Sequence, residues 1–146
     1  MAAYIARVLL FDANPARPIK FDAKLIARGY HLMRADDVDE VLAMANTEHP
    51  DVVIINTPTD GDETAVINAW QERKVPLILI GDRADVEAKA RALKEGVADY
   101  LPHDYRDVEL FARIGSLLRL NTMQEELDRR LDTAEQYGIK DTALVS

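Results

Sequence analysis

Short apolar runs alternate with amphipathic segments along the first 120 residues of the chain. The runs lie at residues 7–11, 30–34, 52–55, 77–80 and 99–101. The 52–55 and 77–80 runs have no interior polar residue, which is typical of strands that are covered on both faces. The pattern therefore predicts five strands, of which the central ones are fully buried.

Helical spacing of apolar residues predicts a helix after each of the first four strands, over about 18–28, 37–49, 63–74 and 85–96. Asp37 with Glu40 has capping-box spacing, Asp85 can cap the fourth helix, and Gly29 and Gly96 follow helices as terminators. Strict alternation of strand and helix predicts an α/β fold with a doubly wound, five-stranded parallel sheet. The inward-facing apolar residues expected on these helices are Ile19, Leu25, Ile26, Val38, Val41, Leu42, Ala45, Val66, Ile67, Trp70, Ala88, Ala92 and Leu93.

The last helix is predicted to be much longer than the others. It can begin at a cap on Asp104 and continue to Gly138, roughly 50 Å at 1.5 Å per residue. Its second half carries an apolar stripe with no remaining domain to cover it, which favours pairing with a second copy of the chain over a solvated tail. We therefore predict a domain at 1–120 and an extended helix and linker at 121–146. The stripe, called the helix seam below, consists of Leu120, Met123, Leu127 and Leu131.

The amino-acid composition excludes several classes of function. The 146 residues are enough for one domain, and the absence of cysteine removes disulfides, thiolate metal sites and thiol nucleophiles. A net charge of −8 disfavours binding to nucleic acid, and no apolar run is long enough to cross a membrane. We expect a cytoplasmic protein that contacts neither nucleic acid nor membrane.

A polar residue follows each of two predicted strands, at the strand end where α/β proteins usually carry their functional side chains. Asp12 comes directly after the first strand, and Asn56 after the third. The carboxyl ends of parallel strands border a common crevice in open α/β sheets. The Asn56 amide can therefore donate a hydrogen bond to the Asp12 carboxylate; the alternative is that Asp12 is simply solvated.

Together with Pro76 before the fourth strand and Gly96–Leu101 leading into the fifth, these residues make 5–120 resemble the receiver domain of bacterial response regulators. The resemblance implies a flavodoxin-like receiver fold in which a histidine kinase phosphorylates one aspartate. It also implies an acidic pair holding Mg²⁺, and a hydroxyl and a lysine that bind the phosphoryl group. A switch aromatic completes the family's set.

The chain departs from this pattern at most of these positions. Asn56 replaces the phosphorylated aspartate, and Ala13 beside Asp12 removes one acid of the pair. Gly81 replaces the hydroxyl residue and His103 the lysine, whereas Tyr100 keeps the switch aromatic. Because an amide cannot form an acyl phosphate and one carboxylate binds Mg²⁺ weakly, we expect a degenerate phosphorylation site with no metal, no cofactor and no enzymatic activity.

The resulting prediction is a pseudo-receiver that works by binding proteins. The resemblance implies a homodimer or partner surface on the fourth helix, fifth strand and fifth helix, with Lys89, Lys94, Tyr100, Arg106 and Arg113. The long helix resembles linkers to an output domain in response regulators of the diguanylate cyclase type, which would place the chain in cyclic di-GMP signalling.

Two other classes of function remain open. The first is a phosphoacceptor that uses a non-standard residue, such as Asp12, with His103 as its cation. The second is a small-ligand module that uses the pocket near Asn56, Gly81 and His103.

Other candidate residues have structural explanations that we prefer. His31 and His49 lack the spacing to share a metal with His103, so a loop histidine is favoured over a ligand. Tyr100 is either a packed aromatic or a residual switch. The acidic loop with Asp60, Asp62 and Glu63 is more typical of a solvated turn than of a Ca²⁺ site.

Overall fold

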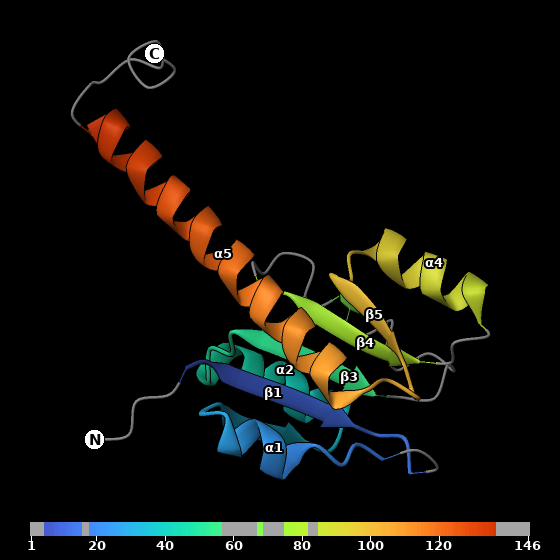
Figure 1. Ribbon diagram of the computed structural model, residues 1–146. Coiled ribbons are helices and arrows are strands. Elements are labelled where there is room, and N and C mark those ends of the chain that lie inside the picture. Colours follow the sequence, from blue (N-terminus) through green and yellow to red (C-terminus); the bar gives the residue numbers. More distant parts are fainter. Residues whose placement is uncertain (1–4, 16–17, 57–66, 69–74, 82–84, 137–146) are drawn as a thin grey trace.

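The computed structural model describes residues 5–15, 18–56, 67–68, 75–81 and 85–136. The predicted five-stranded parallel sheet is confirmed, with strand order β2-β1-β3-β4-β5 (Figure 1). The three central strands carry buried side chains along most of their length, as the uninterrupted apolar runs predicted. The strands are β1 (Arg7–Asp12), β2 (His31–Ala35), β3 (Val52–Asn56), β4 (Leu77–Gly81) and β5 (Asp99–Pro102).

Helices cover both faces of this sheet, so the doubly wound architecture is confirmed as well. One core packs α2 (Val38–Thr47) and α4 (Val86–Glu95) against one face. A second core packs α1 (Asp22–Ala27) and the first part of α5 (Asp107–Gln136) against the other face (Figure 1). The predicted helix over 63–74, including Trp70, and the acidic loop before it lie outside the described residues except for 67–68.

The predicted helix signals at Asp37, Asp85, Gly29 and Gly96 are all confirmed. The Asp37 side chain accepts a hydrogen bond from the Glu40 amide at 2.8 Å, and Asp85 caps α4 in the same way through the Ala88 amide at 2.9 Å. Gly96 ends α4 with a φ of 111°, in the left-handed region where a side chain is disfavoured.

Two helix starts differ from the prediction. The helix expected from residue 18 begins only at Asp22, and in the segment before it the Ile19 amide donates to the Asp12 carboxylate. The long helix begins at Asp107 and not at Asp104, because the carbonyl of Arg106 accepts its first hydrogen bonds, from the amides of residues 109 and 110.

Two side chains predicted to face inward are exposed. Ile26 is 60% exposed and Leu93 is 44% exposed. Each follows a buried helical residue, Leu25 or Ala92, and one residue turns an α-helix by about 100°, which carries the side chain away from the sheet. The apolar face of each helix is therefore narrower than predicted.

The second half of α5 projects beyond the sheet, as predicted from its length (Figure 1). Leu110 and Ile114 are fully buried near its start. The helix seam is exposed, with values of 60% for Leu120, 68% for Met123, 51% for Leu127 and 44% for Leu131. Within the described ranges, no helix is both long and apolar enough to span a lipid bilayer.

Candidate functional site

The strand register places Asp12 beside Asn56 at the carboxyl edge of the sheet. The predicted hydrogen bond between them is present: Asn56 Nδ2 donates to Asp12 Oδ1 at 2.9 Å. Asn56 is 0% exposed, and it is the one fully buried polar residue among those that the structure describes. A buried amide needs partners for both its nitrogen and its oxygen, and the nitrogen is satisfied by the carboxylate.

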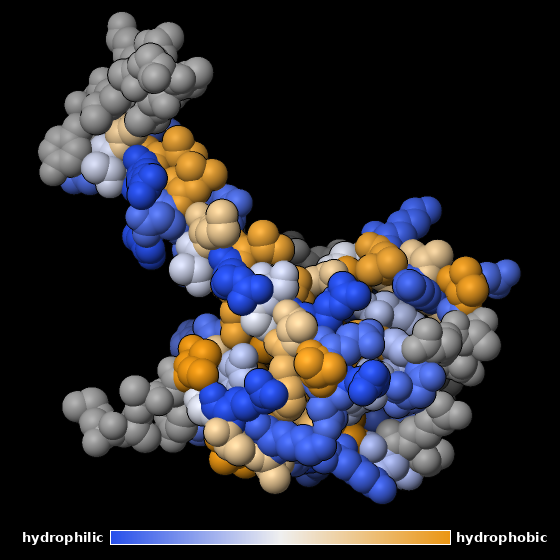
Figure 2. All heavy atoms as spheres, in the orientation of Figure 1, coloured by the Kyte–Doolittle hydropathy of each residue, from blue (hydrophilic) through white to orange (hydrophobic). Residues whose placement is uncertain are grey.

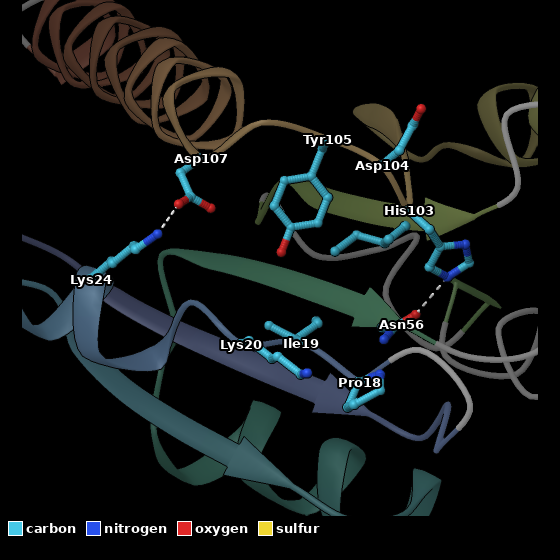
Figure 3. Close-up of a pocket in the computed structure, with 10 residues that line it drawn as sticks. Pro18, Ile19, Lys20, Lys24, Asn56, His103, Asp104, Tyr105 and Asp107 are labelled. Atoms are coloured by element: carbon cyan, nitrogen blue, oxygen red, sulfur yellow. Dashed lines mark hydrogen bonds and ion pairs between the residues drawn. The ribbon is translucent and has the colours of Figure 1, made fainter.

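His103 supplies the partner of the amide oxygen. Its Nε2 lies 3.0 Å from Asn56 Oδ1, and its backbone amide donates to the carbonyl of Gly81 at 2.9 Å (Figure 3). A carbonyl oxygen only accepts hydrogen bonds, so the contact with Asn56 requires the tautomer with the proton on Nε2; the amide nitrogen of Asn14 lies farther from the same atom, at 3.5 Å. His103, a candidate identified from the sequence, is therefore a direct hydrogen-bond partner of Asn56.

Arg34 on β2 is a component of the site that sequence reasoning missed. Its Nη2 lies 3.3 Å from Asp12 Oδ2, and its Nη1 contacts Asp22 at the start of α1. The same Asp12 oxygen accepts the Ile19 amide at 3.0 Å. Its position in the sequence could have indicated this role. Strand β2 lies next to β1, and Arg34 is the polar residue near the carboxyl end of β2. The Asp12 side chain, 8% exposed, is thus held by an amide, a guanidinium and a backbone N–H.

The donor set does not fit Mg²⁺. That ion requires near-octahedral oxygen coordination. Here Ala13 offers no side-chain oxygen, the Asn56 oxygen faces a donor on His103, and Arg34 already neutralises Asp12. Across the described residues, no group of three histidine or acidic side chains is arranged to hold a metal ion.

Tyr100 packs directly over Gly81. A Cβ added to Gly81 would lie 2.0 Å from the tyrosine hydroxyl oxygen and 2.5 Å from Cζ, so no side chain fits at position 81 while the ring stays in place. Tyr100 is 7% exposed and belongs to the core under α2 and α4. The two positions predicted as hydroxyl site and switch aromatic are therefore in contact, with the ring turned inward.

A hollow of about 450 Å³ lies between α1 and the loop from β5 to α5 (Figure 3). Asn56 and His103 form one end of it, and Lys24 pairs with Asp107 at the other. Tyr105 lines the hollow; burial first, then the charges of Asp107, Asp12 and Asp22, raise its pKa to about 12. The phenol is therefore neutral at physiological pH.

Apart from Tyr100, which is buried against Gly81 and not exposed as the surface prediction requires, the residues predicted for an interaction surface lie outside this site. Lys89, Lys94 and Arg106 are exposed. Arg113 on α5 pairs with Asp99 on β5 at 3.3 Å, and its side chain is 53% exposed. The surface thus has a mixed charge, and one of its predicted cations is paired within the chain.

Comparison with known proteins agrees with this architecture, although no family model matches the chain. The response regulator PleD of Caulobacter vibrioides is 30% identical over 139 residues, covering 92% of this chain and 31% of PleD. The receiver domain of the Francisella response regulator 1452 is 25% identical, with a TM-score of 0.68 over 78% of this chain and 97% of that one. NtrX from Brucella abortus shares the fold, with a TM-score of 0.75 at 19% identity, over 85% of this chain and 29% of its own.

This chain spans about a third of the length of PleD. Similarity in sequence and in fold together support a response-regulator receiver domain.

Proposed function

We propose that this receiver domain signals without phosphoryl transfer and acts by binding proteins, including a second copy of itself. The main observation in support is the environment of Asn56. Its side chain is buried, its nitrogen is hydrogen-bonded to Asp12 and its oxygen is hydrogen-bonded to His103. An amide is not a nucleophile toward phosphorus. The same contacts close the sheet edge without a metal ion, because Arg34 supplies the positive charge beside Asp12.

A phosphodonor experiment tests this proposal. The purified chain, incubated with acetyl phosphate and Mg²⁺, is expected to keep its intact mass, because neither a free carboxylate at position 56 nor a metal site is available. An ordinary receiver domain treated in parallel is the positive control. A gain of one phosphoryl group would contradict the proposal, and its loss in Asp12→Asn would favour the alternative in which Asp12 is the acceptor.

Asp12 is a poor acceptor by the same geometry. Both its oxygens already accept hydrogen bonds, from Asn56, Ile19 and Arg34. Attack on phosphorus would need one oxygen to give up these partners within a site that is almost closed to solvent. The small-ligand alternative ranks lower still, because Lys24 beside the hollow is paired with Asp107.

For the binding role, we propose dimerisation along the helix seam and the neighbouring surface of α4, β5 and α5. Figure 2 shows apolar side chains grouped along the projecting part of α5. A row of exposed leucines on a helix that projects beyond its own domain is typical of a helix that pairs with another helix. We further propose that α5 leads toward an output domain in cis, of the diguanylate cyclase type, and that 121–146 is the connecting segment.

The dimer has a direct test. The double substitution Leu127→Glu with Leu131→Glu is expected to change the mass in solution from two copies to one, because it places four carboxylates in the apolar interface of a dimer. Multi-angle light scattering measures the mass. Thr122→Glu with Thr133→Glu is the matched control, since both threonines lie on α5 and are exposed away from the seam. An unchanged mass in the leucine variant, or a monomeric parent chain, would leave dimerisation by the seam untenable.

A further inference from the structure

The apolar stripe of α5 follows a seven-residue repeat, which begins at the partly buried Leu117 and continues along the exposed part of the helix. Counting from Leu117, the core positions a and d of such a repeat fall on Leu117, Leu120, Gln124, Leu127 and Leu131, at intervals of three and four. Met123 then lies at a flanking position instead of in the centre. The next core residue, Ala134, is buried in the single chain, so the exposed apolar core positions end at Leu131, while the exposed flanking position Glu135 follows in the next turn.

This stripe lies to one side of the helix face that packs on the sheet, and only its first residue, Leu117, is packed against the core. Ile114 faces the sheet and is fully buried. At about 100° per residue, the centre of the stripe lies roughly a third of a turn around the helix from Ile114. Two copies can therefore bring their stripes together while their sheets stay on separate sides.

Arg113 extends the stripe toward the sheet, since it is one repeat position before Leu117, and it contacts Asp99 on β5. A hollow of about 390 Å³ also opens along the stripe between α5 and the start of β4. Leu117, Leu120 and Gln124 line one side of it, and Val75 and Pro76 line the other. A partner helix on the stripe would cover this apolar hollow.

We infer, on the basis of the dimerisation proposed above, that two copies of α5 pair in parallel and in register over residues 117–131. The orientation follows first from Gln124. In the parallel register, Gln124 meets Gln124 of the other copy, and the two amides can bond to each other. In the antiparallel register with the greatest overlap, Gln124 meets Leu127 twice, which buries amides among apolar side chains.

The flanking charges favour the same orientation. In the parallel register, Arg130 of each copy lies beside Glu135 of the other, so two opposite-charge pairs form. Arg130 already contacts Glu126 through Nε at 3.4 Å, and its guanidinium has further donors for a second carboxylate. The antiparallel register places Arg130 beside Met123 and brings no opposite charges together.

Single cysteines test the register, because the chain has none of its own. Leu127→Cys is expected to form a disulfide-linked dimer under mild oxidation roughly tenfold faster than Thr122→Cys, since parallel pairing holds the two thiols at high effective concentration. Thr122 is exposed on the outer side of the same helix and is the matched control.

Mixed chains separate the possible failures. When the Leu120→Cys chain is mixed with the Leu131→Cys chain, disulfides between the two different chains should be no more frequent than random pairing gives. A preference for such mixed disulfides, together with slow disulfide formation by Leu127→Cys, would establish the antiparallel register and overturn the inference. Equal, slow linkage of all variants in a chain that light scattering shows to be dimeric would place the interface elsewhere and overturn it as well. A monomeric parent chain would instead remove the dimerisation on which the inference rests.

Discussion

Asn56→Asp should destabilise the fold by about 2–3 kcal/mol at neutral pH, because it buries a second carboxylate beside Asp12. The present amide donates to Asp12 Oδ1 at 2.9 Å, so the variant would replace a hydrogen-bond donor by an oxygen of like charge. His103 and Arg34 would offset part of this repulsion, since both place donors against the pair. The free energy of unfolding in urea measures the effect.

The same variant should gain a pH dependence with a definite sign. Repulsion and burial raise the pKa of the paired carboxyl groups in the folded state above the unfolded value of about 4. The folded state then binds more protons than the unfolded state, so the stability deficit is largest above the raised pKa and shrinks as the pH falls toward 4. Asn46→Asp, the same change on the exposed surface of α2, should alter stability by less than about 0.5 kcal/mol. Equal stability of Asn56→Asp and the parent chain from pH 4 to 8 would show that position 56 is not the closed site described above.

Gly81→Ala should expel Tyr100 from its buried position and cost about 2–3 kcal/mol. The added Cβ would lie within 2.5 Å of the ring carbon Cζ, well inside van der Waals contact, and the rigid ring cannot yield without changing rotamer. Turning outward exposes an aromatic side chain that is now 7% accessible, which forfeits its hydrophobic burial. Urea unfolding gives the magnitude, and the NMR signals of ring-labelled tyrosine report the change in environment.

A double-mutant cycle separates this clash from a general effect of the substitution. In a Tyr100→Ala background, Gly81→Ala should cost less than about 1 kcal/mol, because the ring that blocks position 81 is gone. Gly115→Ala in α5 is the matched control; its Cβ would meet only a flexible Arg119 nitrogen at 3.4 Å, and alanine should stabilise the helix by about 0.5–1 kcal/mol. Additive costs at positions 81 and 100 would mean that the two residues do not share this space.

The contact between Gly81 and Tyr100 accounts for the inward position of the tyrosine ring. Any side chain at position 81 would occupy the space where this ring lies. The glycine at position 81 and the burial of Tyr100 are therefore linked by a single steric condition.

Local features of the sequence determined most of the fold. Uninterrupted apolar runs ended by turn residues specify strands that are buried on both faces, and aspartate caps and left-handed glycines specify the ends of helices, because these effects act over a few residues. The contact between Asp12 and Asn56 could be predicted from the sequence for a similar reason. Parallel strands end at a shared edge of the sheet, so residues at the ends of two adjacent strands lie close together.

Contacts between distant segments were decided only by the tertiary structure. The guanidinium of Arg34 reaches Asp12 across a strand pair, and the Ile19 amide donates to the same carboxylate. Tyr100 fills the space above Gly81 because β4 and β5 run side by side, with Leu79 opposite Tyr100 in the register. Such contacts depend on side-chain direction and strand register in three dimensions, which periodicity along one chain does not encode.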